Sequence, residues 1–122
     1  ETASGNVWKP NGKKGKNPIY RGDVENGTPN GLGFLIYPDG SSYIGRWKNG
    51  LFHGQGKETS NSGKKYIGEW IYGKKDGKGT LIFPSGIKDE GEWNMGKIWK
   101  GVSYNKNGSI RHRYVNGEVT TP

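Results

Sequence analysis

The sequence contains no cysteine, which excludes disulfide bonds, thiolate metal sites and cysteine nucleophiles. Hydrophobic residues are also scarce, at 29% of 122 residues, so we do not expect a large globular core. No apolar run approaches the roughly 20 residues that span a bilayer. The chain begins at Glu1 without an initiator methionine, which favours a fragment or a processed product. These absences leave a small domain or a short repeat array.

Glycine and aromatic residues are abundant instead. The chain has 23 glycines, and its 12% aromatic content, with five Trp and seven Tyr, is too high for a disordered segment. Lysine and arginine number 19 against 11 acidic residues, a net charge of +8. A basic surface favours acidic partners such as phospholipid, nucleic acid or an acidic protein, although the same charge also serves solubility.

A period of 23 residues organises the chain. Tyr20, Tyr43 and Tyr66 recur at this interval, and Asp89 occupies the next equivalent position. Glycine and tryptophan recur with the same period. The further columns are Gly22, Gly45, Gly68 and Gly91; Val24, Trp47, Trp70 and Trp93; and Gly27, Gly50, Gly73 and Gly96.

The same period divides the chain into units. The fourth unit keeps the pattern if one residue is deleted after Gly96, and residues 1–19 read as a degenerate half repeat with a Lys-rich insertion. End units of repeat arrays degenerate because they cap the stack. The predicted units are 20–42, 43–65, 66–88 and 89–110, followed by a partial unit at 111–122.

Each unit reads as a β-hairpin. Alternation places Tyr43 and Trp47 on one face of a strand and Ile44 and Arg46 on the other. Asn-Gly pairs supply the positive φ angles of tight hairpin turns, and Pro-x-Gly turns join one unit to the next. No segment has the 3.6-residue period of an amphipathic helix. We therefore predict an all-β fold, an elongated single-layer antiparallel sheet of stacked hairpins.

The glycines inside the predicted strands need a reason, because a strand glycine is destabilising by about 0.5–1 kcal/mol. A flat aromatic ring can cover a neighbouring strand only where that strand lacks a Cβ, as in aromatic rescue of glycine. We expect the repeat aromatics to form a ladder along one face of the sheet. They are Tyr20, Tyr43, Trp47, Tyr66, Trp70 and Trp93.

The pattern Y-x-G-x-W-x-x-G-x-x-x-G-x-G-x-x-x-x-P-x-G resembles the MORN (membrane occupation and recognition nexus) repeat. Residues 43–63 and 66–86 match it almost column by column, and residues 20–40 match with Val24 in the Trp position. The resemblance implies a twisted sheet of stacked hairpins that acts as a scaffold, dimerisation or docking module. It also suggests binding to acidic phospholipid, and it does not imply catalysis.

Enzyme chemistry has little support in the sequence. His53 precedes Gly54 in a turn region, where stabilising the turn is the favoured role, and His112 is isolated from it. Two separated histidines make no metal site, so we expect no metal or cofactor. The acidic residues Asp89, Glu90 and Glu92 are interpreted as part of a solvated strand face.

Two opposite edges of the predicted array are candidate binding surfaces. Basic residues near the Pro-x-Gly turns form a candidate basic rim for acidic ligands, and apolar residues near the Asn-Gly turns form a candidate apolar rim for proteins. The basic rim comprises Lys13, Lys14, Lys16, Lys64, Lys65, Lys88, Lys106 and Arg111, and the apolar rim comprises Leu51, Phe52, Ile71, Tyr72, Ile98 and Trp99.

These surfaces lead to two functional hypotheses. The first is a non-catalytic module for protein–protein interaction, scaffolding or self-association through the apolar rim, a face or a sheet edge. The alternative is a peripheral membrane module that binds acidic phospholipid headgroups through the basic rim. Nucleic acid ranks third, because the aromatics are already needed to cover glycines.

Overall fold

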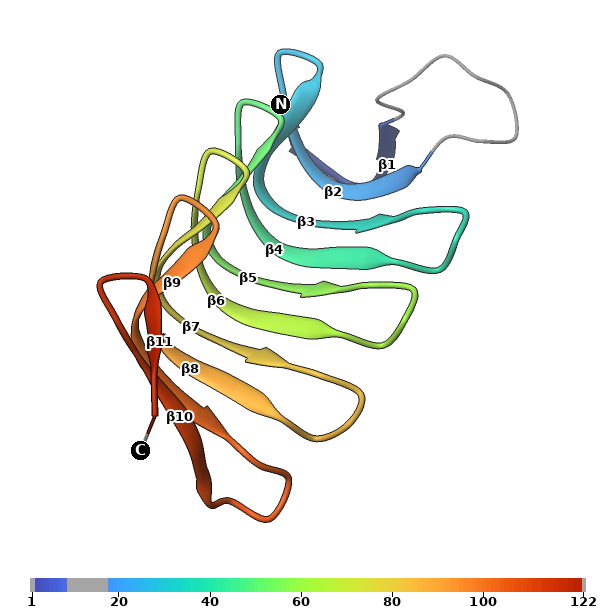
Figure 1. Ribbon diagram of the computed structural model, residues 1–122. Helices are drawn as coiled ribbons and strands as arrows, with labels where there is room; N and C mark the ends of the chain where they lie inside the picture. The colour runs from blue at the N-terminus through green and yellow to red at the C-terminus, as the bar shows by residue number, and fades with distance from the viewer. Residues whose placement is uncertain (1, 9–17, 122) are drawn as a thin grey trace.

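The computed structural model describes residues 2–8 and 18–121 as one antiparallel sheet of eleven strands in chain order (Figure 1). Within these residues there is no helix, and every strand pairs with its neighbours in the sequence. The predicted all-β array of stacked hairpins is therefore confirmed. The strands are β1 (Thr2–Trp8), β2 (Ile19–Glu25), β3 (Thr28–Ile36), β4 (Ser42–Lys48), β5 (Leu51–Thr59), β6 (Lys65–Ile71), β7 (Lys74–Ile82), β8 (Lys88–Asn94), β9 (Lys97–Tyr104), β10 (Ile110–Val115) and β11 (Glu118–Thr120).

The turns at one edge of the sheet have the predicted conformation. Asn26 and Gly27 have φ angles of 53° and 80°, and Asn49 and Gly50 have φ angles of 51° and 83°. Positive φ at both central residues matches the right-handed twist of the flanking strands. The Asn-Gly pairs therefore set the hairpin register locally.

Each hairpin bends part-way along its length, so the sheet forms an open trough (Figure 1). The bend coincides with a β-bulge. Gly45 pairs with Gly56, whereas Trp47 pairs with Phe52, so a two-residue step on β4 matches a four-residue step on β5. Gly54 lies inside this bulge with a φ of 89°, a conformation that favours glycine.

The fourth hairpin has a smaller bulge. Glu92 pairs with Lys100 and Trp93 pairs with Ile98, which leaves Trp99 as a single extra residue. The deletion predicted in this unit therefore shortens the bulge of β9. The paired glycines of the hairpin, Gly91 and Gly101, keep their register.

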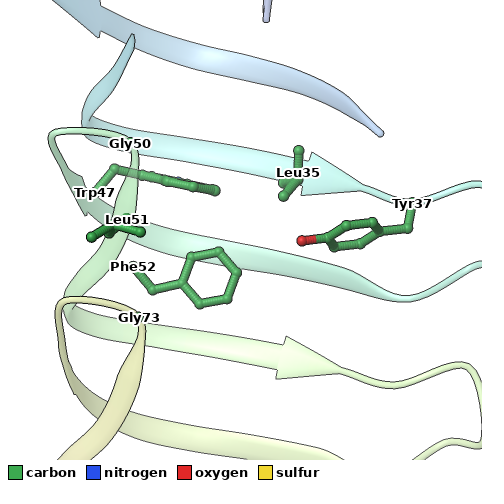
Figure 2. Close-up of a pocket in the computed structure, with 7 residues that line it drawn as sticks. All are labelled: Leu35, Tyr37, Trp47, Gly50, Leu51, Phe52 and Gly73. Carbon is green, nitrogen blue, oxygen red and sulfur yellow. The ribbon is translucent and has the colours of Figure 1, made fainter. Parts of the chain in front are cut away.

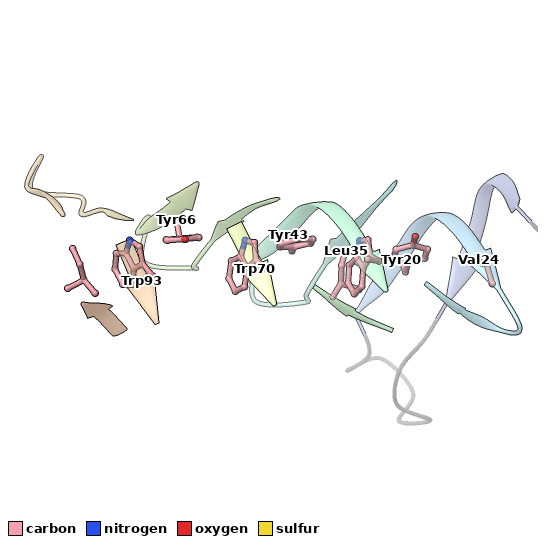
Figure 3. Packing of buried hydrophobic residues seen from close by; sticks show 9 residues of the cluster. Tyr20, Val24, Leu35, Tyr43, Tyr66, Trp70 and Trp93 are labelled. Carbon is pink, nitrogen blue, oxygen red and sulfur yellow. The ribbon is translucent and has the colours of Figure 1, made fainter. Parts of the chain in front are cut away.

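The buried side chains lie in a row along the trough face (Figure 3). Three tyrosine rings cover glycines of the next strand, as predicted. A Cβ at Gly56 would overlap the hydroxyl and ring of Tyr43, and Gly33 and Gly79 stand in the same relation to Tyr20 and Tyr66. Each tyrosine hydroxyl also donates to a backbone carbonyl, at 2.9 Å from Tyr43 to Arg46.

The tryptophans take a different position in the ladder. Their rings stand edge-on to the tyrosines, with centroids 5.2 Å apart for Tyr43 and Trp47 and 5.6 Å apart for Tyr43 and Trp70. The indole Nε1 of Trp70 donates to the carbonyl oxygen of Gly56 at 3.2 Å, and Trp47 and Trp93 make the equivalent bond. Tyrosine therefore covers glycine, whereas tryptophan links one repeat to the preceding one.

Candidate functional site

The apolar rim is only partly the surface that the sequence predicts. Four of its six members have exposed side chains, with 46% exposure for Leu51, 47% for Ile71, 52% for Tyr72 and 46% for Trp99. These four lie at or beside the tight turns or, for Trp99, in the bulge of β9. They remain candidates for contact with a partner.

Phe52 and Ile98 are corrections to that prediction, because both side chains point into the trough. The ring of Phe52 stacks on Tyr43, with centroids 3.7 Å apart and planes 3° apart, and Ile98 is buried. Each pairs across the hairpin with a buried tryptophan, Trp47 or Trp93, and therefore shares its face. Leu51, which precedes Phe52, stays exposed and does not join the buried ladder.

A hollow of about 300 Å³ lies in the trough between the two arms of the bent hairpins (Figure 2). Leu35 and Tyr37 line it from one arm, and Trp47, Leu51 and Phe52 line it from the other. Gly50 and Gly73 complete its wall. Its apolar lining suits an aliphatic or aromatic side chain better than a charged one.

Tyr72 is held in place by neighbouring groups. Its φ of 45° is unusual for a bulky residue, and it occupies the turn position that asparagine fills in the first two units. The backbone N–H of Tyr72 donates to His53 Nδ1 at 3.2 Å, and the two rings lie 4.7 Å apart. This bond confirms the predicted turn-stabilising role of His53. Asn30 and Asp76 accept the equivalent N–H bonds in the neighbouring repeats.

Met95 is a member of this surface that sequence reasoning missed. It occupies the same turn position as Tyr72, with a φ of 50°, and its side chain is 66% exposed. The available signal was the repeat period itself, which aligns Met95 with Tyr72 and Asn49.

The described members of the basic rim are exposed along the opposite edge of the sheet. Lys65 and Lys88 begin strands β6 and β8, and Lys64 and Lys106 lie in the adjoining loops. Arg111 is also exposed, and its guanidinium reaches Ser103 Oγ at 3.4 Å. Lys13, Lys14 and Lys16 lie outside the described residues.

One ion pair lies within the trough. Lys75 Nζ is 3.9 Å from a carboxylate oxygen of Glu58 and lies over the rings of Tyr66 and Trp70, at 5.4 and 5.5 Å from their centroids. Burial raises the pKa of Tyr66 to about 12, with a further contribution from the charge of Glu69. Lys75 therefore places a cation against the aromatic wall of the trough.

The aromatic ladder ends in a polar cluster at Asp89. Glu90 and Glu92 are exposed as predicted, but Asp89 is buried, so the solvated-face interpretation is wrong for this residue. Tyr114 donates its hydroxyl to Asp89 Oδ2 at 3.0 Å, and the fully buried Ser103 is the cross-strand partner of Asp89. Burial and the Asp89 carboxylate together raise the pKa of Tyr114 to about 12.

In the described part of the chain, no group of three or more His, Asp or Glu side chains could hold a metal ion. That part likewise has no helix long and apolar enough to cross a membrane.

A single-layer array of bent hairpins with an aromatic trough defines a class of repeat protein that offers surfaces rather than an enclosed pocket. The MORN repeat model matches three consecutive segments, residues 20–42, 43–65 and 66–88, which together make up more than half of the chain. The chain therefore belongs to the MORN repeat family. No curated protein matched the sequence.

Proposed function

We propose that this MORN array is a non-catalytic interaction module that binds a protein segment along its trough and the exposed part of the apolar rim. The observation that carries the proposal is the apolar hollow between Leu35 and Phe52, with exposed Leu51 at its mouth. Tyr and Trp dominate the binding energy of many protein interfaces, and Tyr72 and Trp99 extend this surface along the turns.

Preorganisation supports this role. Tyr72 is fixed by its backbone bond to His53, and the Lys48 ammonium lies 5.8 Å from the centroid of its ring. A ring that is already ordered loses little conformational entropy when a partner binds. The same surface suits a second copy of the chain, which would make the array a dimerisation module.

The repeats themselves supply conservative test variants. Leu51→Thr and Tyr72→Asn each introduce the residue that another unit carries at the equivalent position, Thr28 or Asn49, so the fold should persist. Lys74→Thr changes the same column in the next unit and is the matched control. Peptides selected on the wild-type chain from a random display library should lose binding to the double variant and keep binding to the control.

Self-association is measured in parallel by sedimentation over a wide concentration range. An average mass that rises with concentration in the wild type, but not in the double variant, supports dimerisation through the trough. A constant mass, together with selected peptides that bind both proteins equally, contradicts the proposal.

We propose a peripheral membrane role as a second candidate, favoured by the exposure of Lys64, Lys65, Lys88, Lys106 and Arg111 along one edge. Each basic residue near an anionic bilayer contributes about 1 kcal/mol. Co-sedimentation with phosphatidylserine-containing vesicles should be strong at low salt, weak near about 0.15 M salt and reduced by Lys64→Glu with Lys88→Glu. Equal binding to neutral vesicles contradicts this role.

A further inference from the structure

The outer face of the sheet, opposite the trough, carries apolar side chains over its N-terminal half. A sheet with one solvated face normally alternates apolar and polar residues, so the outward positions should be polar. In β2 to β6, six of the outward positions are apolar instead, and five of these six side chains have exposures between 40% and 55%. This outer patch comprises Ile19, Leu32, Phe34, Ile36, Ile44 and Ile67.

Five members of the patch are contiguous, because they pair across strands or alternate along β3. Phe34 pairs with Ile44 in the β3–β4 register, and Ile36 pairs with Ile19 in the β2–β3 register. The sixth member, Ile67, is separated from Ile44 by Lys57, which pairs with both of them. A continuous apolar surface of this kind is typical of an interaction site.

The other repeats show that the fold does not require these apolar residues. The position of Phe34 is occupied by Lys57 and Thr80 in the next two units, with the same pairing. The position of Ile44 is occupied by Glu90 two units later. Since polar residues occupy the same places in the same sheet, strand pairing alone does not explain the patch.

The patch contains a hollow and is bordered by cations. The hollow has a volume of about 290 Å³ and is lined by Arg21, Leu32, Phe34 and Ile44, together with three glycines. Arg21 pairs with Phe34, and Arg46 pairs with Leu32. With Lys57, three basic side chains therefore adjoin the apolar residues directly.

Two acidic residues beside the patch accept hydrogen bonds from the backbone of the neighbouring strand. Asp23 accepts the backbone N–H of Leu32 at 3.1 Å, and Glu69 accepts that of Lys78 at 2.6 Å. Glu25 ends β2 beside the turn, and none of these three carboxylates lines the hollow. The hollow is lined by apolar residues and glycines, with Arg21 as the charged member of the lining.

We propose that the outer patch binds an acidic segment of a partner protein that inserts an aliphatic or aromatic side chain into the hollow. Charge complementarity with Arg21, Arg46 and Lys57 selects acidic residues on the partner, and the hollow selects an anchoring side chain rather than a flat surface. The site lies on the face opposite the trough. The array can therefore hold two partners at once, whatever binds in the trough.

The test uses the full chain and a random-peptide display library as the probe. Phe34→Thr with Ile44→Glu introduces the residues that Thr80 and Glu90 supply at equivalent positions, and Thr80→Lys is the matched control on the same face. Peptides that bind the wild type and compete with one another at this face should combine Asp or Glu with a large apolar residue. Their affinity should fall about tenfold or more in the double variant and stay unchanged in the control.

A charge variant keeps the test independent of the apolar substitutions. Arg46→Glu places at this position the residue type of Glu69 and Glu92, its equivalents in later units, so it should fold. It should weaken the same peptides about tenfold, whereas the trough variant with Leu51→Thr and Tyr72→Asn should bind them normally. If the selected peptides lose binding to the trough variant instead, they bind in the trough, as the proposed function expects. The outer patch would then have no ligand, and the proposal for the outer patch would be overturned.

Three further results also overturn the inference. The first is selected peptides without acidic residues, and the second is wild-type affinity in the Phe34→Thr, Ile44→Glu variant. The third is loss, in this same variant, of binding to phosphatidylserine vesicles or of a concentration-dependent mass. Loss of vesicle binding would make the occupant a lipid surface, and loss of the concentration-dependent mass would make it a second copy of the chain.

Discussion

Substituting Gly56 by alanine tests the contact on which the array depends. Gly56 pairs with Gly45 on one side and Gly68 on the other, and the fully buried ring of Tyr43 lies across it. A Cβ at Gly56 would overlap the hydroxyl oxygen and Cζ of Tyr43. The φ of Gly56 is not positive, so alanine is compatible with the backbone and the effect comes from displacing the ring.

The loss can be sized from what the ring contributes. A buried tyrosine removes about 150–250 Å² from water, which corresponds to about 4–6 kcal/mol as an upper estimate at about 25 cal/mol per Å². Displacement also strains the 2.9 Å bond from Tyr43 to the Arg46 carbonyl, which is worth about 1 kcal/mol. Because the site relaxes partly, we expect Gly56→Ala to reduce the free energy of unfolding by about 3–5 kcal/mol.

Urea unfolding followed by tryptophan fluorescence measures this loss. Tyr43→Ala, alone and combined with Gly56→Ala, completes a double-mutant cycle. Once Tyr43 is replaced, Gly56→Ala should cost little further stability, which gives a coupling energy of about 2 kcal/mol or more. Gly40→Ala is the control, because no atom lies within 4 Å of its added Cβ and only its φ of 92° opposes alanine. Additive losses, or a Gly56→Ala protein within about 1 kcal/mol of wild type, would refute the covering role of the ring.

Three further predictions concern pH, the turns and the polar end of the ladder. Burial raises the pKa of Tyr20 and Tyr66 to about 12, so the folded state holds more protons than the unfolded state above pH about 10. The urea midpoint of unfolding should therefore be flat below that pH and fall from about pH 10 to about pH 12. Ionisation of every tyrosine near pH 10 in the folded protein would contradict this. His53→Ala should lower the free energy of unfolding by about 1 kcal/mol, because the hydrogen bond from the Tyr72 N–H is lost. His53→Asn introduces the residue type of the preceding repeat and should retain this bond and the stability. Equal losses of stability in the two variants would exclude the bond as the cause. Asp89→Asn should raise the midpoint of thermal unfolding at neutral pH. The buried Oδ1 of Asp89 has no hydrogen-bond partner among the described residues, and an amide carries no charge to desolvate. An unchanged or lower midpoint would show that the carboxylate is compensated.

Much of the fold follows from local patterns. The tyrosine and glycine columns share one period because each ring must meet a bare backbone on the adjacent strand, and adjacent strands come from adjacent segments of the chain. Asn49-Gly50 specifies its turn through the φ angles that these residues tolerate. Period-two alternation placed Tyr43 and Trp47 inward and Ile44 outward, as the structure shows.

The candidate sites were less predictable, because they depend on neighbours that the period does not specify. Leu51 and Phe52 are adjacent in sequence, and only the pairing of Phe52 with Trp47 decides which of them packs against the aromatic ladder. The outer patch was not recognised because Phe34 and Ile44 belong to different units and meet only through the β3–β4 register.

The sequence by itself determined the class of fold, the period and the ladder, since these depend on contacts between consecutive hairpins. The tertiary structure decided how each bulge is built, and with it which side chains share a face. One extra residue in β9, against two in β5, leaves Trp99 exposed in the bulge beside the buried Ile98. It also decided that Asp89 is buried, because its cross-strand partner Ser103 and the hydrogen-bonded Tyr114 of β10 close over a position that tyrosine fills in the earlier units.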